Sequence, residues 1–148
     1  MPLPTTLQLS ATLCAALFAG AALYINLVEH PARMELDTRV AAAEWAPSYK
    51  RATWMQAPLA LISFLAGTAV WIMGASVGWL IGALLIGAVV PFTFVGIMPT
   101  NHALLAPKRD LGSPETRALL ERWARLHAVR TVLSLAAAVT YLLLLNRA

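Results

Sequence analysis

The sequence contains a single cysteine, Cys14, among its 148 residues. A disulfide bond or a CxxC redox motif requires two cysteines, so thiol–disulfide chemistry within the chain is excluded. Charged residues are also scarce, because they make up 12% of the chain while hydrophobic residues make up 59%. Soluble domains usually contain about 25% charged residues. The composition therefore favours an integral membrane protein, with membrane lipid as a partner.

The sequence also lacks the features of a nucleic-acid-binding protein. Its net charge is +4, but the lysines and arginines stand between apolar runs and form no basic stripe with interleaved aromatic residues. We therefore expect no nucleic-acid partner, and the positions of these residues inform the membrane orientation instead.

Four apolar runs are long enough to cross a bilayer, since about 20 helical residues span a hydrocarbon core of roughly 30 Å. They predict an all-α fold in which residues 1–148 form a single domain, an integral membrane four-helix bundle. The expected spans are residues 5–28, 55–73, 77–98 and 126–145, with inner loops at 29–54 and 99–125. The first run is too long for a signal peptide and follows no basic segment, so we expect it to be retained.

Positively charged residues lie almost entirely at one end of the expected bundle. All lysines and arginines except Arg147 fall within or beside the two inner loops. Because such residues concentrate on the cytoplasmic side of membrane proteins, both termini are expected to lie on the outer side. This pattern predicts an integral protein of a bacterial inner membrane, with its polar residues toward the cytoplasmic side.

Prolines within or next to the apolar runs predict irregular backbone. Pro91 removes a hydrogen bond to the carbonyl of Gly87, so we expect a kink there. Pro31 biases the preceding residue away from helical geometry, which predicts a helix end. The segment 34–50 is expected to be an interfacial helix that is broken near Pro47.

Polar residues from every expected helix converge on one depth. Counted from the outer ends at about 1.5 Å per residue, Gln56 and His127 lie about 24 and 27 Å deep. Asn26 and Asn101 lie about 32 and 33 Å deep on the same count. The full layer consists of Asn26, Glu29, His30, Gln56, Asn101, His102, His127 and Arg130.

Two interpretations of this polar layer are open. Ionisable groups at such a depth usually face the bundle interior and pair, because exposure to lipid costs several kcal/mol. Glu29 and Arg130 then form the expected ion pair, and Trp123, His127 and Arg130 share one helix face through their spacing of four and three. Alternatively, the layer is only the polar rim of the helices, since helix ends carry polar residues and amide side chains often join helices.

Four segments of the sequence resemble one known family. They are NLVEHPAR at residues 26–33, SYKRATWMQAPLA at 48–60, VGIMPTNHALLAP at 95–107 and RWARLHAVRTVLSL at 122–135. Together they resemble the anthrone oxygenase-like family of small four-helix integral membrane proteins, over nearly the whole chain. The positions that match the family pattern are His30, Pro31, Pro99, Asn101, Trp123, His127 and Arg130.

The resemblance implies a membrane oxygenase that acts on a hydrophobic, aromatic or polyketide-like substrate. Fungal members oxidise anthrones to anthraquinones with dioxygen as co-substrate and without an established organic cofactor. Such a reaction needs a base that removes a proton from an activated C–H bond, and histidine suits this role near neutral pH. His127 or His30 is the expected base, with Glu29 orienting it.

Further residues are expected to hold the substrate. Arg130 and Asn101 can stabilise an enolate-like oxygen as preorganised donors. Trp123 can stack on a flat substrate or anchor its helix at the membrane interface. The expected catalytic residues are His30, His127, Glu29 and Arg130, and the expected substrate-binding residues are Asn26, Gln56, Asn101 and Trp123.

Two other functions stay open on the sequence alone. His30, His127 and Glu29 are ligand types for a metal centre, and two histidines at matched depth could flank a haem. No HExxH or CxxC spacing supports a metal site. The chain could also be a non-enzymatic scaffold or transport subunit, which would act as a homo-oligomer.

Overall fold

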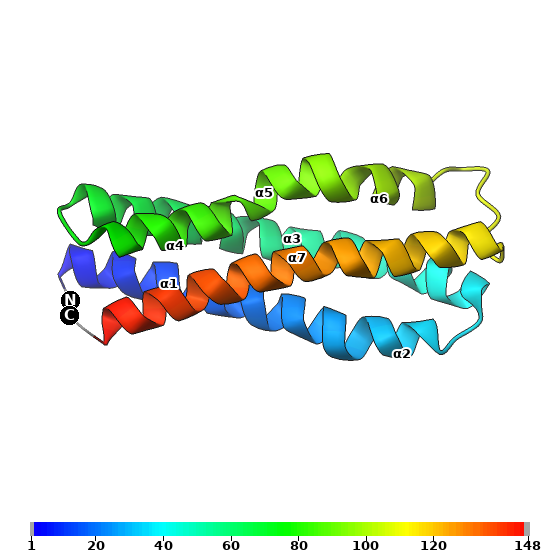
Figure 1. The fold of residues 1–148 in the computed structure, drawn as a ribbon, viewed down its shortest axis with the longest axis horizontal. Coiled ribbons are helices and arrows are strands. Elements are labelled where there is room, and N and C mark those ends of the chain that lie inside the picture. The colour runs from blue at the N-terminus through cyan, green and yellow to red at the C-terminus, as the bar shows by residue number, and fades with distance from the viewer. Residues whose placement is uncertain (1, 147–148) are drawn as a thin grey trace.

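Four helical rods lie side by side in the computed structural model, which describes residues 2–146 (Figure 1). The start of the first rod and the end of the fourth lie at the same end of the bundle (Figure 1). Each rod is long and apolar enough to cross a membrane. The predicted all-α, four-helix architecture is therefore confirmed.

The rods differ in how regular their helices are. In chain order they consist of α1 (Leu3–Tyr24), η1 (Ile25–Glu29) and α2 (His30–Met34), then α3 (Thr38–Ile72), then α4 (Val77–Gly87), α5 (Val89–Phe92), η2 (Thr93–Ile97) and α6 (Met98–Leu104), then α7 (Pro114–Leu145). The segments η1 and η2 are π-helices. The first and third rods are thus interrupted, whereas the second and fourth are single helices.

The rods extend well beyond the predicted membrane spans. Of the predicted inner loops 29–54 and 99–125, only residues 35–37 and 105–113 are not helical. The helices therefore continue through the polar ends of the apolar runs, and where the membrane spans end within them stays a prediction.

Side-chain caps explain why α3 and α7 begin so early. The Asp37 carboxylate accepts a hydrogen bond from the backbone N–H of Arg39 (2.9 Å), and the Ser113 hydroxyl accepts one from that of Thr116 (3.2 Å). Such caps satisfy backbone donors that a helix N-terminus leaves free. The Arg39 side chain also pairs with Asp110 (3.0 Å), which ties the start of α3 to the connection before α7.

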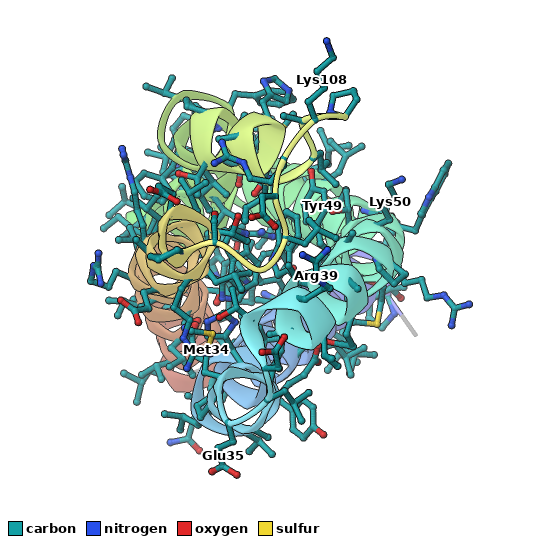
Figure 2. The ribbon with its side chains drawn as sticks, turned by 90° about the vertical axis from the view of Figure 1, so that its right-hand side faces the viewer. Met34, Glu35, Arg39, Tyr49, Lys50 and Lys108 are labelled. Carbon is teal, nitrogen blue, oxygen red and sulfur yellow. The ribbon has the colours of Figure 1, made fainter. Side chains whose placement is uncertain are left out.

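Charged side chains gather at the end of the bundle that carries these two connections. Figure 2 looks at this end, where Glu35, Lys50 and Lys108 extend outward. Arg147 is the one basic residue that the sequence does not place near the two inner loops, and it lies outside the described residues. Which side of the membrane this charged end occupies stays a prediction.

Of the three backbone changes predicted at prolines, one occurs as predicted. The kink predicted at Pro91 is confirmed, because α4 ends at Gly87 and α5 and α6 are offset from its line (Figure 1). The break predicted at Pro47 is wrong, since α3 runs through it. Pro47 is exposed, so the carbonyl that loses its partner there can be solvated.

The helix end predicted at Pro31 is also wrong, and the π-helices show why. Each π-helix ends two residues before a proline: η1 before Pro31 and η2 before Pro99. The residue after each π-helix donates its N–H to the carbonyl five residues back. The wider turn takes up an extra residue ahead of a proline that cannot donate, so both rods continue.

The half of the bundle near the termini is packed tightly around Tyr141. A Cβ atom on Gly67 or Gly82 would overlap the Tyr141 side chain, so α3 and α4 approach α7 closely only because glycine stands there. The Tyr141 ring stacks on Trp79, with ring centroids 5.1 Å apart. This half is largely apolar and closed, and the polar layer lies in the other half.

Candidate functional site

Seven buried side-chain nitrogen or oxygen atoms among residues 2–146 have no hydrogen-bond partner. They are His30 Nε2, Trp45 Nε1, Gln56 Nε2, Thr100 Oγ1, Asn101 Oδ1, Trp123 Nε1 and Arg130 Nε. All belong to α2, α3, α6 and α7 in the half of the bundle remote from the termini. Buried polar atoms are nearly always paired in folded proteins, so this concentration indicates a place that binds a ligand or ordered water.

His127 is held by Asn26 in one defined orientation. The amide N–H of Asn26 donates to the carbonyl of Ala124 (3.1 Å), and its Oδ1 accepts from the Thr131 hydroxyl (2.5 Å). The same oxygen therefore accepts from Nδ1–H of His127 (2.8 Å). In the neutral ring this leaves the lone pair on Nε2, and no residue in the described chain forms a hydrogen bond with that atom.

Arg130 brings a guanidinium into the same region without a carboxylate partner. Its Nη2 donates to Oε1 of Gln56 (2.8 Å), and the guanidinium lies 5.3 Å from the centre of the Phe18 ring. Its Nε is buried and unpaired. Within residues 2–146 no aspartate or glutamate forms an ion pair with it, so the predicted pair of Glu29 with Arg130 is wrong.

Glu29 pairs instead with Arg33, four residues later in the same rod. Arg33 is 3% exposed, pairs also with Glu44 of α3 and donates to the Ser48 hydroxyl oxygen (3.2 Å). The Ser48 hydroxyl in turn donates to the Glu29 carboxylate (2.5 Å). Two carboxylates thus surround one guanidinium, and this charged network joins the first and second rods.

His30 takes part in the same network through its Nδ1. Arginine can only donate, so Nδ1 accepts from Nη1 of Arg33 (3.2 Å), and the proton of the neutral ring lies on Nε2. The imidazole packs on the Trp123 indole with ring centroids 5.3 Å apart. His127 lies 4.8 Å from the same indole. The lone pair that a base needs is therefore occupied in His30 and free in His127.

A small internal cavity of about 10 Å³ lies where these groups meet. Its lining includes Tyr49, Gln56, Trp123, His127 and Arg130. A cavity of this size holds about one water molecule. His127, whose Nε2 is free of hydrogen bonds in the described chain, and Arg130, whose Nε is unpaired, therefore line the same small cavity.

Two larger hollows adjoin this cavity. One has a volume of about 170 Å³, lies between α3 and the α5–η2 segment, and shares Tyr49, Thr53 and Arg130 with the cavity. The other is an open groove of about 680 Å³ between the first rod and α3, and it shares Glu29 and Ser48 with the cavity. The cavity thus shares lining residues with a larger hollow on each of two sides.

The structure brings most of the residues predicted from the sequence together. Those that border the small cavity are Glu29, Gln56, Trp123, His127 and Arg130. Asn26 does not line the cavity but is hydrogen-bonded to His127, which does. Asn101 does not line it either: it is fully buried on α6 and donates to Met98 Sδ (3.7 Å). Trp123 is 4% exposed, so its alternative role as an interfacial anchor is wrong.

Sequence reasoning missed several residues of the site. Arg33 was counted only as a loop charge, although its spacing of four from Glu29 is the signal for an ion pair on one helix face. Trp45 and Tyr49 have the same spacing on α3, and their rings stack with centroids 5.1 Å apart. The sequence predicts a helix break at Pro47, between these two residues, and so gives no reason to pair them.

The metal-ligand set considered from the sequence is not assembled. Between residues 2 and 146 no three histidine, cysteine, aspartate or glutamate side chains gather closely enough to hold a metal ion. The Glu29 carboxylate is bound by Arg33 and Ser48, and the imidazoles of His30 and His127 both pack on an indole.

Comparisons with known proteins agree on one family. Residues 45–140 match the family model described as anthrone oxygenase. The chain is similar to a protein of Aspergillus fumigatus named anthrone oxygenase tpcL, with 28% identity over 144 residues that cover 89% of this chain and 88% of that protein. No solved structure matches the chain. The matched segment 45–140 includes Gln56, Trp123, His127 and Arg130.

Proposed function

The chain belongs to the anthrone oxygenase family, and we propose that it is a membrane-embedded oxygenase for a hydrophobic aromatic ketone of the anthrone class. Dioxygen is the co-substrate, and a CH₂ group between two aromatic rings becomes a carbonyl. One observation carries this proposal: the free Nε2 of His127 and the unpaired Nε of Arg130 belong to side chains that border the same buried cavity.

His127 acts as the base. Its Nε2 takes a proton from the CH₂ group, whose acidity comes from the two rings and the ketone opposite. The resulting imidazolium keeps its Nδ1–H on Asn26, so the ring neither turns nor changes tautomer during the transfer. A base held in this way loses little orientational freedom in the transition state.

Arg130 stabilises the charge that proton removal creates. The negative charge spreads onto the ketone oxygen, and the half-buried guanidinium of Arg130, which has no carboxylate partner, is the complementary group. Gln56 fixes Nη2 of Arg130, so Nε stays available to the substrate. The unpaired N–H groups of Trp45 and Trp123 give the cavity wall further donors, which suits an oxygen-rich aromatic ligand.

The remaining steps balance with dioxygen as the only oxidant. The enolate passes one electron to dioxygen, and the carbon radical and superoxide combine to form a peroxide on that carbon. The His127 imidazolium returns its proton to the outer peroxide oxygen. Loss of the second C–H proton and cleavage of the O–O bond then give the carbonyl and one water molecule.

Glu29 and His30 serve as positioning residues. Both contact Arg33, and His30 packs on Trp123, whose other neighbour is His127. The network therefore fixes the wall of the cavity without touching the reacting carbon.

Oxygen uptake with an anthrone, measured on the purified protein in lipid nanodiscs, tests the proposed function. Wild type should consume one dioxygen per anthrone and form anthraquinone, with one ¹⁸O atom introduced from ¹⁸O₂. His127→Ala should lower kcat by at least about 100-fold, because a general base contributes about 10²–10⁴-fold. His102→Ala is the matched control, since this histidine is exposed on α6.

The assignment has clear failing results. Equal rates in wild type and His127→Ala would remove His127 from the base role. A wild-type protein that binds but never oxidises the anthrone panel would contradict the oxygenase function itself.

A further inference from the structure

The polar cavity is too small for an aromatic ketone, and the hollows beside it differ sharply in character. The groove of about 680 Å³ on the side of the first rod is bordered by Glu29, Glu44 and Arg51. The hollow of about 170 Å³ on the opposite side is lined mainly by apolar side chains, including Phe18, Ala57, Ala60, Val89 and Phe94. A neutral, flat aromatic molecule is favoured by the second surface, because burying it there displaces no charged group.

We propose that this apolar hollow, between α3 and the α5–η2 segment, is the binding subsite for the aromatic rings of the substrate and its entrance from the hydrocarbon layer. The occupant is a planar aromatic ketone whose oxygen reaches Arg130 while its rings stay among the apolar side chains. The inference rests on the proposed function for the identity of the ketone, and on the contacts below for the route.

The inner end of the hollow leads directly to the reacting groups. Tyr49, Thr53 and Arg130 line both the hollow and the cavity that contains His127. Arg130 is the charged residue of the hollow's lining, and its guanidinium already lies over the Phe18 ring of that lining. A ring system in the hollow therefore reaches Arg130 with its polar edge, beside the cavity that His127 lines.

Tyr49 forms the movable part of the wall. It lies on the bundle side of α3, whereas its neighbour Lys50 points outward (Figure 2). Its hydroxyl donates only to Met98 Sδ (3.7 Å), which is a weak acceptor. Turning this side chain breaks that weak hydrogen bond and the stacking on Trp45, and it joins the hollow to the cavity.

The outer end of the hollow opens onto the apolar surface of the bundle. Val90 and Phe94, at its edge, are 43% and 65% exposed. Ala60 and Val90 also line a neighbouring apolar groove of about 630 Å³ between α3 and α4–α5. These surfaces belong to rods long and apolar enough to span a membrane, so a substrate dissolved in lipid would meet this opening first.

The irregular backbone of the third rod creates the opening. The break after Gly87 and the π-helix η2 offset α5 and α6 from the line of α4 (Figure 1). Prolines and π-helices are the usual causes of such offsets, and π-helices occur frequently at functional sites. The same Pro91 that kinks the rod thus leaves room beside α3.

Binding of 9,10-anthraquinone to the protein in nanodiscs tests the subsite, with quenching of intrinsic tryptophan fluorescence as the readout. Ala57→Phe fills the hollow from an exposed position on α3, where the added ring does not enter the packed core. It should raise Kd for anthraquinone about tenfold or more, because a blocked apolar contact of this size is worth at least one decade. Ala16→Phe, on an exposed position of α1 away from the hollows, should stay within about twofold.

Oxygen uptake on the same variants separates this inference from the proposed function. Ala57→Phe should raise KM for the anthrone while kcat changes little, since His127 and Arg130 are untouched. Binding that Ala57→Phe weakens, in a protein without oxygen uptake, would support the subsite and sink the proposed function. Equal Kd values for wild type and Ala57→Phe, equal losses in Ala57→Phe and Ala16→Phe, or no anthraquinone binding by wild type would each overturn the subsite. If lipid acyl chains alone occupied the hollow tightly, the wild-type protein would not bind anthraquinone.

Discussion

Two arginines in the polar half of the bundle, the buried Arg33 and the half-buried Arg130, have opposite surroundings. Arg33 is enclosed by the carboxylates of Glu29 and Glu44, whereas Arg130 has an amide oxygen and an aromatic ring as neighbours. A guanidinium whose charge is already balanced holds the structure together, and one whose charge is unbalanced attracts an anionic ligand. This difference is the reason for assigning Arg33 to architecture and Arg130 to the substrate.

The structural role of Arg33 predicts a large loss of stability on substitution. Arg33→Met leaves Glu29 and Glu44 without their partner, and breaking a buried pair in this way costs about 3 kcal/mol. Arg39→Met is the matched control, because its pair with Asp110 is solvent-exposed and contributes about 0.5 kcal/mol. Reversible unfolding in mixed micelles measures both variants. Similar losses in the two would show that the Arg33 network adds no more than a surface pair.

Asn26 controls which nitrogen of His127 is free. Asn26→Leu removes the acceptor for Nδ1–H, so both tautomers become accessible and kcat should fall about 10–100-fold, as for other residues that orient a reactive histidine. Thr131→Val removes only the second partner of the Asn26 oxygen and should change kcat less than about threefold. Nitrogen-15 NMR of labelled histidine identifies the tautomer directly. A wild-type spectrum with the proton on Nε2 of His127 would contradict the assignment.

The sequence predicted the depth of these residues but not their direction around each helix. Counting at a uniform rise placed Asn26, Gln56 and His127 in one layer, and the structure joins Asn26 to His127 and lines one cavity with His127 and Gln56. The π-helices η1 and η2 have more residues per turn than an α-helix. Side chains after each of them therefore point in other directions than a uniform turn per residue predicts. The absence of Asn101 from the cavity follows from a direction that counting along the rod does not supply, whereas the pairing of Glu29 with Arg33 follows their spacing of four.

Glycines on different helices of this bundle have different packing roles. At Gly82, a Cβ atom would overlap the Tyr141 ring, whereas at Gly20 it would meet nothing within 4 Å. The first glycine allows α4 and α7 to approach, and the second only lowers the helix propensity of α1. Apolar run length revealed the helices, but the packing role of each glycine depends on the neighbouring rod.

The same contrast gives opposite signs for one substitution. Gly82→Ala should destabilise the bundle by about 1–3 kcal/mol, because the added methyl group overpacks against Tyr141. Gly20→Ala should be neutral or stabilise it by up to about 1 kcal/mol, because alanine is the better helix former and no atom opposes it. Unfolding midpoints in the same micelles measure both. A tolerated Gly82→Ala would contradict the close contact between α4 and α7.

As a whole, the molecule is divided into a closed, apolar half and a polar half that contains the cavity. Tyr141, Trp79 and small residues close the end near the termini, while the cavity, both π-helices and the charged connections lie toward the other end. The lysines and arginines also concentrate in the half remote from the termini, and this asymmetry is the basis of the predicted membrane orientation. Homo-oligomerisation stays an expectation, since a single chain already brings together the cavity and its hollows.

The charge distribution predicts where the two ends of the molecule lie. Both termini are expected on the outer side. In a bacterial inner membrane, a reporter enzyme that is active only in the periplasm should therefore be active when it is fused after residue 146. At residues 105–113, by contrast, only a reporter that is active in the cytoplasm should be active. The opposite pattern would place the polar half on the outer side.

Proton abstraction by His127 is the central claim, and deuterium exchange at the anthrone CH₂ group under anaerobic conditions tests it most directly. Without dioxygen the enolate cannot go forward, so repeated removal and return of the proton exchanges it with D₂O. Wild type should accelerate exchange at least about 100-fold over the Ala variant of His127, with Arg130→Gln intermediate and His102→Ala equal to wild type. Exchange at the same rate in wild type and His127→Ala would contradict the claim.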